Sequence, residues 1–384
     1  MTLYRQDLAY ARQVGALLRE DGMLYALIGT YIISASIVLT VLSRDVWRSL
    51  CLYLDSWLLS AVAVMLVYVA TRLCWTALRS ARCGQTASLY VQFGRIVTPR
   101  LVANAALYAA ITVYFGAFTG LKCTFPLIRP FCFDPFLSQL NRSIHRGVLW
   151  RALQALFDRG WGNQLVFLSY YGVWPMILAF SPILAAFLQD RVLRRRYLVC
   201  YVLSWMLLGT IAALIFMSAG PIFYGHVTGD AHRYVRMQHY LRAHGMTWGA
   251  QHLWDVYRRG AIEPGAGISD FPSMHVTIST LATCLAWSLR RWLGMVMTAF
   301  TTLIVLSSAY LGWHYMVGDY VVVPAVVALW CSTAPRRFSV SMPVLVYDGG
   351  RKSAWGSPAP FGHPAAPALH AGAQASPLGA SAQG

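Results

Sequence analysis

Eight long apolar segments constrain the fold of this chain more than any other feature of its sequence. A helix needs about 20 apolar residues to cross a bilayer, and each segment reaches or approaches that length. Of the 384 residues, 57% are hydrophobic and only 12% are charged, which is too much apolar surface for one water-soluble core. We therefore predict an all-α polytopic membrane protein with about eight transmembrane helices. They are expected at residues 23–43, 50–72, 101–120, 164–187, 198–218, 272–289, 293–312 and 315–333.

The basic residues indicate how the chain is oriented. The formal net charge of +17 would suggest nucleic acid in a soluble protein. Here Lys and Arg lie mostly between the apolar segments, where membrane topology and anionic lipid explain them, so we expect no nucleic-acid partner. An even number of spans places both termini on one side of the membrane. Most basic clusters fall on that side, which the positive-inside rule makes cytoplasmic: 5–19, 72–100, 191–196, 290–291 and 336–337.

The pattern divides the chain into four regions. Residues 1–22 form a cytoplasmic N-terminal segment and residues 23–120 form three transmembrane helices, the first of which lacks a cleavage pattern and is interpreted as an anchor. Residues 121–335 form the core, and its two long loops lie on the far side of the membrane. Residues 336–384 are rich in Ala, Gly, Pro and Ser, so we expect a disordered cytoplasmic tail.

The first long loop, 121–163, carries basic residues on the side where the positive-inside rule disfavours them. One explanation is an amphipathic segment, such as 136–157, that lies on lipid headgroups. The other is that some of these residues bind a phosphate. Cys123 and Cys132 also fall in this loop and could form a disulfide in an oxidising compartment. The basic residues are Lys122, Arg129, Arg142, Arg146, Arg151 and Arg159.

The second long loop, 219–271, contains five histidines, but their spacing matches no common metal-ligand pattern. We interpret them as surface residues of a cap.

Two short motifs each place a histidine at the mouth of an apolar segment. The first is Phe271-Pro272-Ser273-Met274-His275, and the second is Tyr310-Leu311-Gly312-Trp313-His314-Tyr315. If the intervening segments form a hairpin across the bilayer, both imidazoles emerge on the same side. Taken alone, the first motif is also typical of a capped helix with a solvent-facing histidine. The presence of the second motif favours a functional site that contains both histidines.

Two adjacent imidazoles can carry out phosphoryl transfer. One attacks the phosphorus atom while the other protonates the departing oxygen. The Ser273 hydroxyl and the free amides of the first helical turn favour an anion there. A carboxylate on the attacking ring would fix its tautomer, and Asp319 is the candidate. Asp270, just before the first motif, could hydrogen-bond His275 or a substrate hydroxyl, and the default expectation is that it faces water at the helix start.

The two motifs closely resemble the paired motifs of the type 2 phosphatidic-acid phosphatase superfamily, which shares its histidine chemistry with vanadium haloperoxidases. Within that superfamily the chain looks most like the bacterial branch related to inositolphosphorylceramide synthase. The resemblance covers about residues 120–333. Further matching pieces are Ser218 to Tyr224, Leu253-Trp254, Lys122 to Asp134-Pro135, and Trp150.

The resemblance implies a role for each matching residue. His314 would be the nucleophile that forms a phosphohistidine, and His275 the general acid and later the base. Ser273 and the Met274 amide would hold phosphate oxygens. Lys122 and Arg129 match the first motif of the superfamily and would contact the phosphate. No metal or other cofactor is implied.

Two positions depart from the family pattern. The arginine expected ahead of the second histidine is Ser308, as is typical of the transferase-like branch. The aspartate expected four residues after that histidine is Gly318, with Asp319 one position later. A five-residue step on an ideal helix turns the side chain about 140° away, so the contact with His314 requires a bulge at Gly318 or does not form.

The resemblance therefore implies a phosphatase-like helical core that acts on a membrane lipid phosphate. Water as acceptor would make it a phosphatase, and a lipid or polyol hydroxyl would make it a phosphotransferase. The implied location is the bacterial inner membrane, with both termini cytoplasmic and the active site periplasmic. The alternative is a catalytically impaired lipid-binding or transport-associated protein on the same scaffold. The sequence does not indicate an oligomeric state.

Overall fold

The computed structural model describes residues 2–59, scattered residues between 62 and 78, and residues 98–334. These residues form helices, turns and short connections without a strand, so the predicted all-α fold is confirmed for them. The helices described below belong to one compact unit, Met1–Pro335, which is separate from Arg336–Gly384. The predicted tail at 336–384, the clusters at 336–337 and most of 72–100, and much of the span 50–72 lie outside the described residues.

The N-terminal part consists of helices that pack along one another. The longest, α6, begins with Thr98 as its N-cap and continues to Ile128, past the predicted end of this span at residue 120. Lys122 and Cys123 therefore lie in a helix and not in a loop, because the apolar sequence continues on both sides of the lysine. The helices are α1 (Thr2–Glu20), α2 (Gly22–Val41), α3 (Val46–Cys51), the π-helical η1 (Leu54–Leu58) and α6 (Pro99–Ile128).

The core contains two long composite helices and three simple ones. The first composite helix is α9 (Gly162–Phe167), the π-helical η2 (Leu168–Val173) and α10 (Trp174–Ala186). The second is α11 (Arg191–Met206), the π-helical η3 (Leu207–Ala212) and α12 (Ala213–Ile215). The simple helices are α16 (Met274–Leu289), α17 (Arg291–Tyr310) and α18 (Met316–Ser332), of which α16 and α17 form the predicted hairpin.

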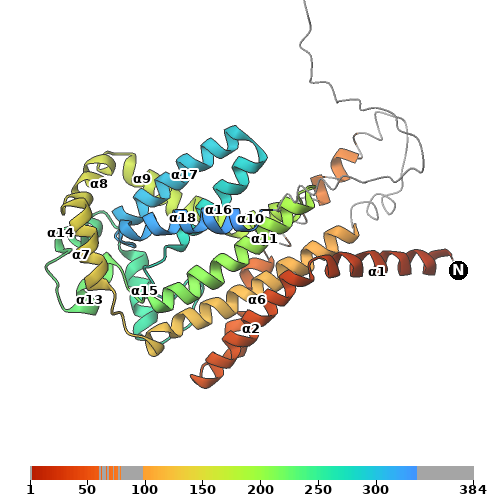
Figure 1. Cartoon of the computed structure of the whole chain (residues 1–384), viewed down its shortest axis with the longest axis horizontal. Coiled ribbons are helices and arrows are strands. Elements are labelled where there is room, and N and C mark those ends of the chain that lie inside the picture. The colour runs from red at the N-terminus through yellow and green to blue at the C-terminus, as the bar shows by residue number, and fades with distance from the viewer. Residues whose placement is uncertain are drawn as a thin grey trace, which may run out of the picture. The chain divides into compact units, whose positions relative to one another are not determined.

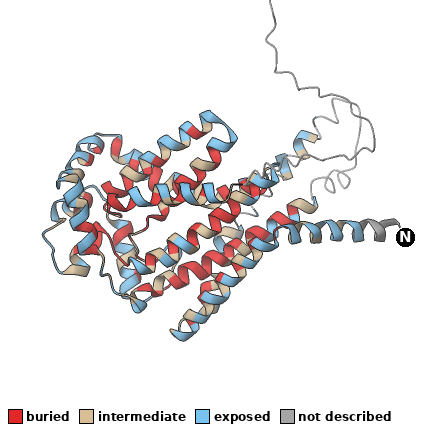
Figure 2. Ribbon diagram, in the orientation of Figure 1, coloured by how far each residue is buried: buried red, intermediate tan, exposed pale blue. Residues whose placement is uncertain are grey.

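Five helices of the described residues are long and apolar enough to cross a membrane, and α16 and α18 are shorter apolar helices. These seven correspond to seven predicted spans. Large apolar side chains such as Ile37, Met176 and Val296 are exposed on their outer faces, whereas the buried residues face inward (Figure 2). Exposed apolar faces of this kind suit lipid, so the chain is a membrane protein. The five helices are Gly22–Val41, Pro99–Ile128, Gly162–Ala186, Arg191–Ile215 and Arg291–Tyr310.

Short helices form a cap at one end of the bundle (Figure 1). The amphipathic segment expected at 136–157 consists of two helices, α7 and α8, separated at Arg146 and Gly147 by left-handed backbone with φ of 52° and 72°. Cys123 and Cys132 are free thiols, so the disulfide considered from the sequence is not formed. The cap helices are α7 (Asp134–His145), α8 (Leu149–Phe157), the 3₁₀ turn η4 (Pro221–Phe223), α13 (Tyr224–Thr228), α14 (Val235–Ala243) and α15 (Trp248–Arg258).

Polar contacts fasten the N-terminal helices to the core at both ends. At the end away from the cap, buried Arg194 donates to both carboxylate oxygens of Asp21, at 2.6 and 2.7 Å. At the cap end, Arg44 donates to the Gly260 carbonyl at 2.9 Å. Removing one partner of a buried ion pair leaves an uncompensated charge, so the first contact fixes where α2 and α11 meet.

Candidate active site

The two histidines of the sequence motifs lie side by side, as the hairpin predicts. Helix α16 starts at Met274, with Ser273 as its N-cap, so His275 lies in its first turn. Helix α17 ends at Tyr310, and Gly312, with φ of 73°, reverses the chain before His314 and α18. The centroids of the two imidazole rings are 6.2 Å apart.

His275 is held between two aromatic rings. The ring of Tyr170 stacks on it at a centroid distance of 4.0 Å and an angle of 11°, and that of Trp174 at 3.7 Å and 28°. The Trp174 indole N–H also donates to the His275 carbonyl at 2.9 Å. Tyr170 comes from the π-helical η2, and such segments are frequent at functional sites. With its faces stacked in this way, the imidazole presents its edge, and hence its nitrogen atoms, to its surroundings.

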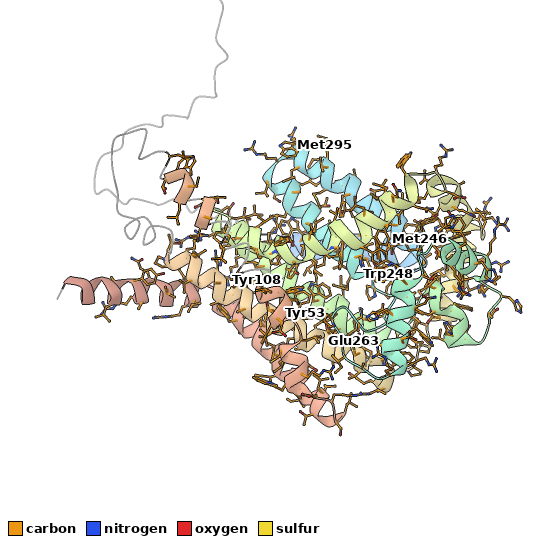
Figure 3. All side chains as sticks on the ribbon, turned by 180° about the vertical axis from the view of Figure 1, so that it is seen from behind. Tyr53, Tyr108, Met246, Trp248, Glu263 and Met295 are labelled. Carbon is orange, nitrogen blue, oxygen red and sulfur yellow. The ribbon has the colours of Figure 1, made fainter. Side chains whose placement is uncertain are left out.

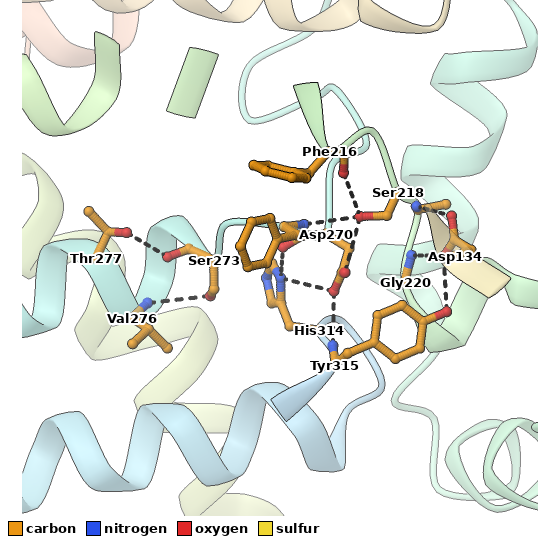
Figure 4. Close-up of polar contacts among 12 residues, drawn as sticks. Asp134, Phe216, Ser218, Gly220, Asp270, Ser273, Val276, Thr277, His314 and Tyr315 are labelled. Carbon is orange, nitrogen blue, oxygen red and sulfur yellow. Dashed lines mark hydrogen bonds and ion pairs between the residues drawn. The ribbon is translucent and has the colours of Figure 1, made fainter. Parts of the chain in front are cut away.

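His314 is held by Asp270 (Figure 4). Its Nδ1 contacts the Asp270 main-chain carbonyl and lies 3.4 Å from the carboxylate oxygen Oδ1. A carbonyl oxygen only accepts hydrogen bonds, so Nδ1 carries the proton and Nε2 of the neutral ring has the free lone pair. Asp270 is itself fixed because its Oδ1 accepts from the Tyr315 amide at 2.9 Å and its Oδ2 accepts from the Ser218 hydroxyl at 3.2 Å.

Asp270 thus takes the place that the sequence analysis gave to Asp319, and the expectation that Asp270 faces water is wrong because it is buried. Neither carboxylate oxygen of Asp319 has a hydrogen-bond partner among the described residues, and α18 is regular from Met316 without the bulge that the predicted contact required. At Gly318, an added Cβ would lie 2.9 Å from the ring of Phe271. The glycine leaves room for this ring, beside Asp270.

A second buried carboxylate, Asp134, supports this arrangement. It accepts hydrogen bonds from the amides of Ala219 and Gly220 at 2.7 and 2.9 Å and from the Tyr315 hydroxyl at 3.0 Å. Burial, and then the negative charge of Asp270, raise the pKa of Asp134 to about 6. Asp134 therefore links Ala219, Gly220 and Tyr315 to the cap helix α7, which it begins.

Both histidines line a cavity of about 560 Å³, hereafter the aromatic cavity. Lys122 lines it too, and no Asp or Glu is among the described residues that line it. Tyr53, from the N-terminal helices, and Trp248, from the cap, both line it and are marked in Figure 3. Its walls are rich in aromatic side chains, including Trp57, Phe115, Phe118, Tyr171, Trp205 and Trp248. An apolar cavity with a cation at its polar end fits an anion that carries an apolar group.

The structure brings some of the predicted phosphate contacts to this cavity and not others. Lys122 and Met274 line it. Ser273 does not, because its Oγ caps α16 by accepting from the Val276 amide at 3.4 Å. Arg129 does not line it either. Its guanidinium instead lies over the ring of Phe133, 5.7 Å from the ring centroid.

Several site residues escaped the sequence analysis. Tyr170 and Trp174 are spaced four apart on one helix, which is also the spacing of ordinary core aromatics. Ser269, which lines the aromatic cavity, adjoins the first motif but has no pattern of its own. The aromatic residues of the N-terminal helices lie far from both motifs in the sequence.

A family model described as the PAP2 superfamily matches residues 135–343. Neither a curated protein nor a solved structure matches the chain. Lys122 and the N-terminal wall of the aromatic cavity precede the matched segment.

The pKa of Asp134 predicts how stability changes with pH. Its folded value of about 6 exceeds the ordinary 3.8, so its contribution is complete below about pH 4 and is lost as the pH rises through about 6. The loss corresponds to about 3 kcal/mol. In Asp134→Asn this dependence should disappear, so the unfolding midpoint in detergent micelles should fall less between pH 4 and pH 7 than in the wild type.

The control is Asp255→Asn, which changes an exposed carboxylate on α15 and should keep the wild-type profile. An unchanged pH slope in Asp134→Asn would contradict the assignment.

Proposed function

Because this chain belongs to the PAP2 superfamily, whose members are phosphatases, we propose that it cleaves a membrane lipid phosphate or phosphodiester through a phosphohistidine on His314. The observation that carries this proposal is the aromatic cavity, where two histidines and Lys122 meet an apolar wall without a lining carboxylate. Its volume of about 560 Å³ lies within the usual range for ligand sites, about 300–1,000 Å³. The lipid chain would occupy the aromatic part and the phosphate the end near the histidines.

The first half-reaction is built on the proton at Nδ1 of His314, with His275 in its protonated form as the acid. The free lone pair on Nε2 of His314 attacks phosphorus as the bond between phosphorus and the leaving oxygen breaks, and His275 gives its proton to that oxygen. The attacking ring becomes cationic, and the Asp270 carboxylate 3.4 Å from its Nδ1 stabilises it. Lys122 and the Met274 amide would offset the charge on the phosphoryl oxygens.

In the second half-reaction an acceptor hydroxyl attacks the phosphohistidine. His275 takes the proton of that hydroxyl, and the bond between phosphorus and Nε2 of His314 breaks. Water gives a phosphatase, and a lipid or polyol hydroxyl gives a phosphotransferase. Ser308 in place of the family arginine favours the branch resembling inositolphosphorylceramide synthase, and we propose an inositolphosphotransferase-like reaction on this ground. Neither step requires a metal ion.

The charge distribution supports a location for the site. The basic clusters at 191–196 and 290–291 lie at the helix ends opposite the start of α16 and the end of α17. By the positive-inside rule the histidines then face away from the cytoplasm. We propose the periplasmic side of a bacterial inner membrane, with both termini cytoplasmic.

The alternative is a lipid-binding protein that has lost catalysis. Its sequence basis is the displacement of Asp319 from the expected position and the absence of the family arginine at Ser308. Asp270 supplies a carboxylate beside the proposed nucleophile, so the geometry favours the enzyme.

Substitution of the proposed nucleophile tests the function. Full-length protein in nanodiscs should release phosphate, or transfer a labelled headgroup, from at least one of phosphatidic acid, polyprenyl diphosphate or phosphatidylinositol, the last with ceramide as acceptor. In His314→Ala turnover should fall by about 10³-fold or more, because the covalent step is lost.

The matched control is His226→Ala, which changes a cap histidine stacked on Trp254 and should retain turnover. Wild-type activity in His314→Ala would refute the mechanism. Lipid binding without turnover of any substrate would support the alternative.

The two candidate carboxylates can be compared directly. We expect Asp270→Ala to lower kcat by about 10²-fold or more, because the imidazolium loses its partner and the Tyr315 amide loses its acceptor. Asp319→Asn should lower kcat less than about fivefold, because a group without a hydrogen-bond partner orients nothing. The reverse ranking, in enzyme shown to be folded by its melting temperature, would restore Asp319 as the orienting residue.

The two candidate phosphate cations form another matched pair. We expect Lys122→Gln to lower kcat/KM by about 10- to 100-fold, the usual effect of losing a charge-assisted hydrogen bond. Arg129→Gln removes the same charge outside the aromatic cavity and should change kcat/KM less than about threefold. Equal losses of kcat/KM in the two variants would contradict a specific phosphate contact of Lys122 and indicate a general effect of positive charge.

A further inference from the structure

A second cavity, of about 390 Å³, shares His314 with the aromatic cavity, and among the described residues only His314 lines both. It lies among α7, α8, the turn between them, α14 and the start of α18, and we call it the basic cavity. Its lining includes four arginines and His145, without an Asp or Glu among the described residues. The arginines are Arg142, Arg146, Arg151 and Arg233.

These arginines lack anionic partners. None of their four guanidinium groups has a carboxylate oxygen within 4.0 Å in the part of the chain that the structure describes, although the main-chain N–H of Arg233 donates to Asp230 at 3.3 Å. Arg233 instead donates to the side-chain amide oxygen of Gln139 at 3.1 Å. In the same cap, Arg259 and His252 do pair with Glu263. Four like charges around one cavity repel each other, and a bound anion would remove that repulsion.

The backbone between α7 and α8 brings the cations together. Arg146 has φ of 52°, which is uncommon for a residue other than glycine. This break separates the two amphipathic helices and lets Arg142 from one and Arg151 from the other line the same space. His145 is fixed there by the Tyr320 hydroxyl at 2.9 Å.

We propose that the basic cavity binds a phosphate group on a second ligand, distinct from the phosphate under attack in the aromatic cavity. Arginine forks suit phosphate oxygens. The site also accounts for Arg142, Arg146 and Arg151, three of the six basic residues of the loop 121–163 that lie where the positive-inside rule disfavours them. Its place in the reaction, as the site of a phosphorylated polyol acceptor or of the released phosphate, rests on the proposed function. Binding itself does not.

Two sources of that phosphate group can be distinguished: a soluble phosphate compound and the headgroup of an anionic lipid. In the first arm, inorganic phosphate and inositol phosphate are titrated by calorimetry into full-length protein in phosphatidylcholine nanodiscs. In the second, enrichment of phosphatidylglycerol around the protein is measured in mixed nanodiscs. Both arms use a Lys122→Gln/His275→Ala background, which removes the proposed phosphate cation and the proposed general acid of the aromatic cavity and so prevents turnover.

The test compares two double variants with the same change in charge. Arg142→Gln/Arg151→Gln should weaken binding at least tenfold in one arm. Arg159→Gln/Arg236→Gln, which changes exposed arginines outside the basic cavity, should change it less than twofold. The arm that responds identifies the source of the phosphate.

Equal losses in the two double variants, or no loss in either arm, would overturn the proposal. Because no turnover is measured, the binding result can be interpreted even if the protein is not an enzyme. Conversely, an active enzyme whose basic cavity binds nothing would refute this inference alone.

Discussion

The contact between Nδ1 of His314 and the main-chain carbonyl of Asp270 is the interaction on which the site depends. It joins residues 44 positions apart, at the start of α16 and at the turn between α17 and α18. It also decides which nitrogen of the ring is free to react. The buried polar groups around it are paired with one another through Asp134, Ser218 and Tyr315, and a satisfied network of this kind makes the geometry rigid.

The departure from the family pattern at Gly318 and the position of Asp270 belong to one structural arrangement. Where the family has an aspartate four residues after the histidine, Gly318 leaves room for the ring of Phe271. Phe271 follows Asp270 directly, so the packing of this ring against α18 places the preceding carboxylate next to His314. A side chain at 318 would push that ring away. The loss of a carboxylate at one position and its supply from another are therefore parts of the same packing arrangement.

The sequence predicted the features that local pattern controls. Apolar length located seven spans, and the hairpin between the motifs brought His275 and His314 together. Prediction from the sequence failed where a contact partner comes from a distant segment. Nothing near Asp270 shows that it faces a residue 44 positions later, and Tyr170 and Trp174 have the spacing of core aromatics. Lys122 was assigned to a loop because a span was taken to end at a charge, whereas α6 continues past it.

The aromatic and basic cavities share His314 but differ in the chemistry of their walls and in the part of the chain that forms them. Tyr53, Trp57 and Phe115 of the aromatic wall come from helices that precede the family-matched segment, whereas the histidines and the basic cavity lie within it. Tyr53 also accepts a hydrogen bond from the Gly265 amide at 2.7 Å, close to the first motif. The N-terminal part of the chain therefore shapes the space beside the two histidines. Under the proposed function, the shared core performs the chemistry, and these helices determine which apolar group can reach it.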